Sequence, residues 1–159
     1  MPRTVLVTGG NRGIGRTIAE QFIAQGDRVA VTSRNGDAPE GALAVAADVT
    51  DSDSLDAAYT TVENELGPVE IIVANAGITR DNLLMRMSDE EFEDVINTNL
   101  TGVYRTVRRG ITNLIRSKWG RIILISSVSG LYGVAGQANY SSSKAGLVGL
   151  ARSITREVG

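Results

Sequence analysis

The sequence contains no cysteine and no histidine among its 159 residues. The absence of cysteine excludes disulfide bonds, thiol nucleophiles and cysteine-ligated zinc. The absence of histidine excludes Ser-His-Asp hydrolysis and every histidine-ligated metal site. Hydrolases and metalloproteins of these kinds are therefore outside the functions open to this chain.

The sequence also lacks a strong net charge and a long apolar run. Its formal net charge is only -2, so it has no electrostatic footprint for nucleic acid or for an anionic membrane. No apolar run reaches the ~18 residues of a membrane span. The first predicted strand starts directly after Arg3, which leaves no room for a signal peptide. We therefore expect a cytoplasmic protein that binds neither nucleic acid nor membrane.

Short apolar runs alternate with amphipathic helical patterns along the whole chain. The apolar runs predict strands at residues 4–8, 28–33, 43–47, 69–74 and 121–126. Apolar residues at helical spacing predict helices at residues 14–25, 52–66, 88–119 and 137–158. Such alternation implies right-handed crossovers and a parallel sheet covered on both faces. The prediction is a single α/β domain over residues 1–159 with a doubly wound Rossmann sheet, because no linker or repeat divides the chain.

A glycine-rich turn joins the first strand to the first helix, where a doubly wound fold binds a dinucleotide. It reads Gly9-Gly10-Asn11-Arg12-Gly13-Ile14-Gly15, and no Lys-Ser/Thr pair follows that would make it a Walker A loop. Glycines permit positive φ and a close approach of the backbone to a pyrophosphate, which the helix N-terminus stabilises. A plain tight turn is the alternative, but the strand before it and the helix after it favour a dinucleotide site.

The residues at the end of the second strand bear on the choice of dinucleotide. An acidic residue there would bind the ribose 2′-hydroxyl of NAD. The chain has Ser33 and Arg34 instead, and Arg12 lies in the glycine turn. Two guanidinium groups suit a 2′-phosphate, so the sequence favours NADP(H). The alternatives are a pair of surface arginines without a ligand, and Asp37 as a rival ribose ligand.

Tyr140 and Lys144 are four residues apart on the last predicted helix, so they share one face. An ammonium near a phenol favours the phenolate, and such a tyrosine can give or take a proton. Ser127 lies upstream at the end of the fifth strand, where its hydroxyl can bind the same substrate oxygen. A surface pair is the alternative. Ser141 and Lys144 also form a Ser-x-x-Lys pattern, but the partner motifs of penicillin-binding enzymes are absent.

Two further polar features belong to the same region of the predicted fold. Asn75-Ala76-Gly77 follows the fourth strand, on the side of the sheet where ligands bind in such folds, although an ordinary turn is the alternative. Asn99 interrupts the apolar stripe of the long helix, and a buried amide needs hydrogen-bond partners. Either Asn99 satisfies local backbone, or it holds a water or a side chain near the site.

Taken together, these residues resemble the short-chain dehydrogenase/reductase family over the whole chain. The motifs, in order, are Thr8-Gly-Gly-Asn-Arg-Gly-Ile-Gly15, Asp48-Val49, Ala74-Asn-Ala-Gly77, Asn99, Ser127 and Tyr140-Ser-Ser-Ser-Lys144. Within the family, residues 77–87 and 95–100 resemble the 3-oxoacyl-[acyl-carrier-protein] reductases of type II fatty-acid synthesis. Residues 127–133, with residues 137–140, are similar to the mycobacterial kind that acts on mycolate precursors.

The resemblance implies NADPH-dependent reduction of a 3-oxoacyl thioester linked to acyl-carrier protein. In it Tyr140 protonates the ketone oxygen as hydride leaves the nicotinamide, and Ser127 orients the carbonyl. Lys144 binds the nicotinamide ribose and assists Tyr140, and Asn99 holds a water of the proton relay. No metal takes part. With the residues argued above, the expected cofactor-binding set is Gly9, Asn11, Arg12, Gly13, Ile14, Gly15, Arg34, Asp48, Val49, Asn75, Ala76, Gly77, Tyr140 and Lys144.

The resemblance also sets expectations beyond these residues. Family members run to about 250 residues as one domain, with seven strands, of which five are predicted here. The sequence thus corresponds to the N-terminal part of the family, and we expect little activity from this part alone. We further expect the protein to form a homo-oligomer, and an acidic carrier protein to bind near Lys118. Two alternatives stay open: a reductase of another ketone or alcohol, and a non-catalytic module that only binds the dinucleotide.

Overall fold

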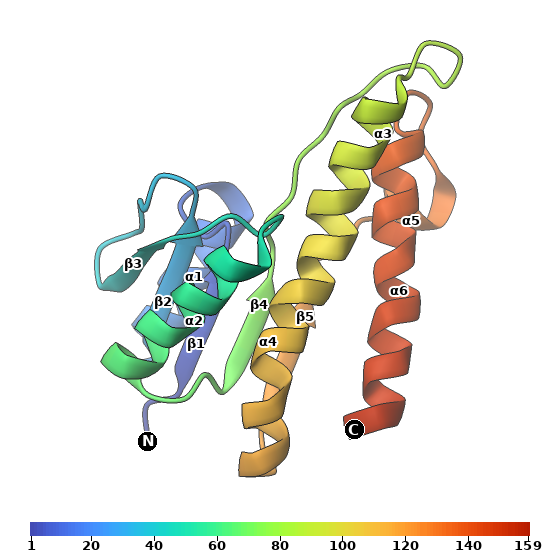
Figure 1. The fold of residues 1–159 in the computed structure, drawn as a ribbon. Helices are drawn as coiled ribbons and strands as arrows, with labels where there is room; N and C mark the ends of the chain where they lie inside the picture. Colours follow the sequence, from blue (N-terminus) through green and yellow to red (C-terminus); the bar gives the residue numbers. More distant parts are fainter.

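A computed structural model describes all 159 residues and contains one sheet of five parallel strands (Figure 1). The order across the sheet is β3-β2-β1-β4-β5, so the chain moves outward on one side of β1 and then crosses to the other side. This order confirms the predicted doubly wound Rossmann architecture. The strands are β1 (Thr4–Thr8), β2 (Arg28–Ser33), β3 (Ala42–Ala46), β4 (Ile71–Ala74) and β5 (Arg121–Leu124).

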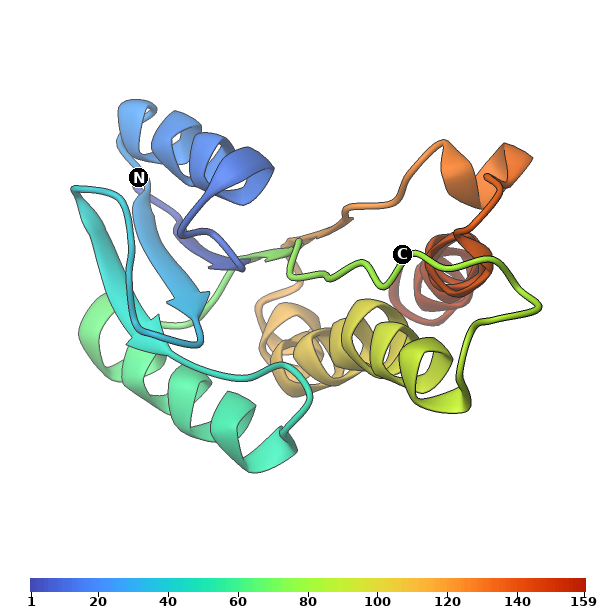
Figure 2. The same ribbon diagram turned by 90° about the horizontal axis from the view of Figure 1, so that it is seen from above.

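Helices cover both faces of the sheet (Figure 2). Helix α1 lies on one face, α2 and α4 lie on the other, and α6 packs against α3, α5 and the π-helical turn η1. None of these helices combines the length and the hydropathy that crossing a bilayer requires. The helical elements are α1 (Gly13–Ala24), α2 (Ser52–Leu66), α3 (Asp89–Ile96), η1 (Asn97–Thr101), α4 (Gly102–Ser117), α5 (Ser129–Tyr132) and α6 (Ala138–Val158).

Strand β1 is the centre of the core, and all of its residues are buried. Successive side chains of a strand point to opposite faces of the sheet. Val5 and Val7 therefore pack with Ala19 of α1 on one face. Leu6 points to the other face, where it packs with Tyr59 of α2. Burial on both faces explains why this strand reads as a continuous apolar run rather than an alternating pattern.

Side-chain caps fix where α2 and α3 begin. Asp51 accepts hydrogen bonds from the backbone N–H groups of Asp53 (2.9 Å) and Ser54 (3.4 Å). Ser88 and Glu91 form a reciprocal capping box at the start of α3, as the sequence predicts. Each cap satisfies N–H groups that the first turn of a helix leaves without partners.

The long helix predicted from Ser88 is not uniform. It is α-helical in α3, passes through the π-helical turn η1, and resumes as α4. Helix α4 ends at Ser117 with Lys118 in the left-handed region (φ 54°), before the predicted stop at Gly120. Single π-helical turns inside α-helices occur frequently at functional sites. Helix α5 is an element that the sequence pattern does not predict.

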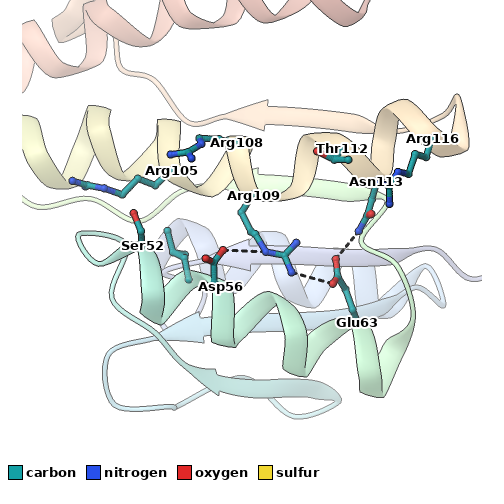
Figure 3. A pocket seen from close by; sticks show the side chains of 10 residues that line it. Ser52, Asp56, Glu63, Arg105, Arg108, Arg109, Thr112, Asn113 and Arg116 are labelled. Carbon is teal, nitrogen blue, oxygen red and sulfur yellow. Dashed lines mark hydrogen bonds and ion pairs between the residues drawn. The ribbon is translucent and has the colours of Figure 1, made fainter.

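A polar groove of about 520 Å³ runs between α2 and α4 (Figure 3). Arg109 of α4 spans it, with its guanidinium 3.1 Å from Asp56 and 3.3 Å from Glu63 of α2. The same guanidinium lies 5.1 Å from the centre of the Tyr59 ring, and Asn113 donates a 2.6 Å hydrogen bond to Glu63. The two carboxylates are therefore engaged in holding α4 to α2, so the groove offers no free acid–base pair.

Gly110 marks a close approach of α4 to the sheet and to α2. A Cβ atom at this position would lie 2.6 Å from Ile72 Cδ1 and 2.8 Å from the Tyr59 hydroxyl. The Tyr59 hydroxyl has little freedom to move, because it donates a 2.7 Å hydrogen bond to the carbonyl oxygen of Thr106. We expect Gly110→Ala to lower the free energy of unfolding, measured in urea, by about 1–3 kcal/mol through overpacking.

Gly149→Ala is the matched control. This glycine is exposed in α6, and a Cβ atom there would have no neighbour within 4 Å. Because alanine is the better helix former, the control is expected to raise the free energy of unfolding by about 0.5–1 kcal/mol. Two variants of equal stability would contradict the close packing at Gly110.

Candidate active site

The candidate site lies along the sheet edge at the carboxyl ends of the strands. Because β1, β4 and β5 are parallel, the segments that follow them all leave the sheet at this edge. These segments carry the glycine turn, residues 75–77 and Ser127, respectively. Ligands of doubly wound folds bind at this edge, beside the central strands.

Asn75 and Thr8 attach the glycine turn to the end of β4. The Asn75 side-chain amide donates hydrogen bonds to the carbonyl oxygens of Thr8 and Gly9, both at 3.0 Å. The Thr8 hydroxyl accepts from the backbone N–H groups of Asn75 (3.1 Å) and Ala76 (3.2 Å). A Cβ atom on Gly15 would lie 2.3 Å from the Asn75 amide nitrogen, so this position needs glycine. Asn75 thus shapes the turn itself, which the sequence does not reveal.

The glycine turn leaves the N-terminus of α1 without a side-chain cap and without an acidic residue in its first turn. Gly9 and Gly13 have positive φ (64° and 54°), a conformation that glycine adopts readily. Arg12 and Ile14 are exposed on the turn, Ile14 by 67%. Uncapped N–H groups and the helix dipole together favour a bound anion. The turn therefore fits the pyrophosphate of a dinucleotide, with an apolar side chain left free beside it.

Two arginines are predicted to favour NADP(H), namely Arg12 in the glycine turn and Arg34 directly after β2. Both are exposed and take part in no ion pair. Asp37, the rival ribose ligand, accepts a hydrogen bond from the Asn35 amide, and its carbonyl oxygen accepts from the Ser33 hydroxyl at 2.9 Å. The Asp37 carboxylate is thus engaged within its own loop, whereas the two guanidinium groups are available to a phosphate.

Asp48 and Val49 follow β3, and each has contacts of its own. The Asp48 carboxylate accepts hydrogen bonds from the hydroxyl (2.7 Å) and the backbone N–H (2.8 Å) of Thr50. These bonds, the hydroxyl first, hold the pKa of Asp48 below its usual range, with a smaller contribution from the charge of Arg34. Val49 is buried, and a Cβ atom on Gly102 would lie 2.9 Å from it. The expected contact of either residue with the cofactor stays a prediction.

Tyr140 and Lys144 lie on consecutive turns of α6, as the sequence predicts. The Lys144 ammonium is 5.6 Å from the centre of the Tyr140 ring and donates a 2.7 Å hydrogen bond to the carbonyl oxygen of Ile125. Lys144 is only 4% exposed, and this burial lowers the pKa of its ammonium from the ordinary value of 10.5. A poorly solvated positive charge attracts any negative charge that develops beside it.

The structure places Ser127 against Ser129 and not in a hydrogen bond with Tyr140. The hydroxyls of Ser127 and Ser129 are 2.8 Å apart, and Ser127 also accepts from the backbone N–H of Ser129 at 3.2 Å. The neighbouring Ser126 reaches α6 instead, where its hydroxyl donates a 2.9 Å hydrogen bond to the carbonyl oxygen of Lys144. The role of Ser127 toward a substrate oxygen stays a prediction.

Asn99 binds backbone that is distant in the chain rather than local, together with one side chain of α6. Its side chain is fully buried and pairs with both backbone polar groups of Ile78, accepting from the N–H at 2.8 Å and donating to the carbonyl at 2.9 Å. It also donates to the hydroxyl of Ser143 at 3.3 Å. Asn99 therefore joins the segment after β4 to α6. Its expected water contact stays a prediction.

Sequence reasoning missed four side chains that hold these groups in place. Two of them, Asn139 and Ser143, are fully buried polar residues spaced i, i+4 with the buried Leu147 on α6. Polar residues on an otherwise buried helical face are the same signal that singled out Asn99, so this pattern offers a way to find them. The four are Thr8, Ser126, Asn139 and Ser143.

The chain matches one known protein family over nearly its whole length. The family model described as short chain dehydrogenase matches residues 3–159. The chain belongs to this family. The match confirms the resemblance that the sequence motifs indicate, from the glycine turn to Lys144.

Several curated proteins are similar to the chain. The 3-oxoacyl-[acyl-carrier-protein] reductase MabA of Mycobacterium tuberculosis is 56% identical over 98% of this chain and 63% of its own length. The 3-oxoacyl-[acyl-carrier-protein] reductases FabG of Vibrio harveyi and Escherichia coli are 46% and 45% identical, over 98% of this chain and 67% of their own length. The chain thus spans 61% to 63% of the length of its mycobacterial relatives.

The buried Lys144 ammonium makes stability depend on pH in a defined direction. Because burial lowers its pKa in the folded state, the unfolded chain holds more protons between that lowered pKa and 10.5. This group therefore adds to the free energy of unfolding as the pH rises toward 10.5. We expect the free energy of unfolding of the unmodified chain, relative to that of Lys144→Met, to increase from about pH 8 to about pH 10.5.

Lys118→Met is the matched control, because Lys118 is exposed at the end of α4. Urea unfolding of both variants at the two pH values isolates the effect of burial, and the Lys144 effect is expected to exceed the Lys118 effect. A Lys144→Met difference that does not change with pH, or that moves in favour of the variant, would contradict the buried ammonium.

Proposed function

We propose that this chain carries the cofactor site and the catalytic side chains of an NADPH-dependent reductase, which converts a 3-oxoacyl thioester into the 3-hydroxyacyl form in fatty-acid synthesis. The observation that carries the proposal is the Tyr140 phenol beside the buried Lys144 ammonium, on a helix joined to the same sheet edge as the glycine turn. The names of the mycobacterial and FabG relatives support the substrate class.

In the proposed reaction the ketone carbon gains a hydride, which NADPH supplies when bound, and the ketone oxygen gains a proton. Tyr140 donates that proton, since its side chain is half-buried at the start of α6 and open to a substrate oxygen. The Lys144 ammonium stabilises the negative charge left on the phenol oxygen. Ser127 donates a hydrogen bond to the ketone oxygen. In the structure its hydroxyl pairs with that of Ser129, and either of the two can be the donor, so the proton of Ser127 is not tied to Ser129.

The proposed cofactor is NADPH rather than NADH. The pyrophosphate is held by the uncapped start of α1, where residues 9–15 fit an anion. Arg34 and Arg12, exposed and without carboxylate partners, bind the 2′-phosphate. The Asp37 carboxylate, which accepts a hydrogen bond from Asn35, is not the ribose ligand in this proposal.

The proposed substrate carrier is an acyl-carrier protein, and the protein is proposed to work in the cytoplasm as a homo-oligomer. Lys118 and Arg116 at the end of α4 are exposed and present positive charge to an acidic carrier. Exposed apolar side chains on α4 and α6 support contact between copies through these helices, namely those of Tyr104, Ile115 and Val158.

Tyr140→Phe tests the proposed proton donor. In a protein that spans the full length of the relatives, NADPH consumption with an acetoacetyl thioester is expected to fall by about 100-fold or more, because the variant keeps the ring but has no proton to give. Tyr132→Phe removes an equivalent hydroxyl from a side chain that is 84% exposed on α5, and it is expected to keep full turnover. Retained turnover in Tyr140→Phe would remove this residue from the acid role. NADPH binding by the unmodified protein without any turnover would favour a non-catalytic binding module.

A further inference from the structure

Both backbone polar groups of Tyr140 are bound by fully buried side chains. The N–H group donates to Oδ1 of Asn139 at 2.7 Å, and the carbonyl oxygen accepts from the hydroxyl of Ser143 at 2.7 Å. Asn139 and Ser143 are each 0% exposed. The turn of α6 that carries the phenol is thus held on both sides of residue 140, by side chains with no part in the proton transfer proposed above.

Ser143 is linked in turn to Asn99 in η1. A serine hydroxyl has one proton, and here it goes to the Tyr140 carbonyl, so the oxygen of Ser143 receives the Asn99 amide at 3.3 Å. The same amide group of Asn99 is fixed by the backbone of Ile78. A continuous chain of hydrogen bonds therefore runs from Ile78 through Asn99 and Ser143 to Tyr140. Such chains strengthen one another in a low-dielectric interior.

A serine inside a helix often bonds to a carbonyl three or four residues earlier without further consequence. Thr155 of the same helix is such a case, since its hydroxyl donates only to Ala151 in an exposed position. Ser143 differs because a side chain 44 residues away in sequence donates to it. Both members of that pair are fully buried, where an unpaired amide or hydroxyl is costly. The bond to Tyr140 is therefore part of a tertiary contact.

Asn139 fixes the other side of the same turn. Its amide group donates to the carbonyl oxygens of Arg80 (2.8 Å) and Glu91 (3.0 Å). These carbonyls belong to the loop after β4 and to α3. Through Asn139, the N–H of Tyr140 is therefore connected to the same loop that Asn99 contacts at Ile78. Tyr140 is thus positioned from two directions, against the loop after β4 and the start of α3.

We propose that Ser143 is a positioning residue for Tyr140: it transmits the location of Asn99, and so of the segment after β4, to the turn of α6 that holds the phenol near the Lys144 ammonium. Asn139 holds the opposite side of that turn. The functional meaning of this arrangement rests on the proposed acid role of Tyr140. The geometry, and the test below, do not require turnover.

The test is the position of the Tyr140 ring relative to the Lys144 side chain, measured by the nuclear Overhauser effect between their protons, with the Tyr140 signals assigned by their absence in Tyr140→Phe. Ser143→Ala removes one link of the chain, and this effect is expected to weaken, because the ring can then move away from Lys144. Ser142→Ala makes the same change at the adjacent exposed residue and is expected to leave the effect in place. An unchanged effect in folded Ser143→Ala would overturn the proposal.

A double variant tests whether Asn99 acts through Ser143. The Tyr140–Lys144 nuclear Overhauser effect in Asn99→Ala with Ser143→Ala is expected to equal that in Ser143→Ala alone, since both substitutions interrupt one chain. Two losses that add in full would overturn the proposed transmission. Should Ser143→Ala not fold, Ser143→Cys keeps most of the volume with a weak donor, and its effect must also weaken. The turnover of Tyr140→Phe tests the acid role of Tyr140 separately. Its outcome does not change the conclusion on how Ser143 positions the ring.

Discussion

The parallel pairing of two buried strands, β1 and β4, is the constraint on which the rest of the site depends. Val5 pairs with Ile71 and Val7 with Val73, and every residue of both strands is buried. Since a shift of one residue would turn these apolar side chains to the wrong face, the register is fixed. Both strands therefore deliver their following segments to one edge, where Thr8 and Asn75 join the glycine turn to residues 75–77.

The second half of the site is attached to that edge by buried polar side chains, because α6 forms no part of the sheet. Asn99 bridges Ile78 and Ser143, and Lys144 donates to the carbonyl of Ile125. Buried polar groups are costly unless they are paired, and paired groups define one geometry rather than several. The burial that lowers the pKa of Lys144 also strengthens the action of its charge on Tyr140. Position and electrostatics in this site thus have a common physical origin.

Much of this was accessible from the sequence, since continuous apolar strands, amphipathic helices and the capping box at Ser88 are local signals. The Tyr140–Lys144 pair follows from helical spacing alone. The π-helical turn and the role of Asn75 were not predictable, because they depend on partners distant in the chain, such as Ile78 for Asn99. Ser127 faces Ser129 because of the short helix α5, which has no pattern of its own. Family membership is confirmed, while the roles of individual site residues stay predictions.

The proposed function requires that this sheet edge bind NADPH beside a tyrosine proton donor. The most direct measurement is a titration of the purified chain with NADPH and, in parallel, with NADH, followed by cofactor fluorescence or by calorimetry. We expect saturable binding of NADPH that is at least about tenfold tighter than that of NADH, because the exposed guanidinium groups of the proposed site would meet the 2′-phosphate. Saturable binding of neither dinucleotide, or tighter binding of NADH, would contradict it.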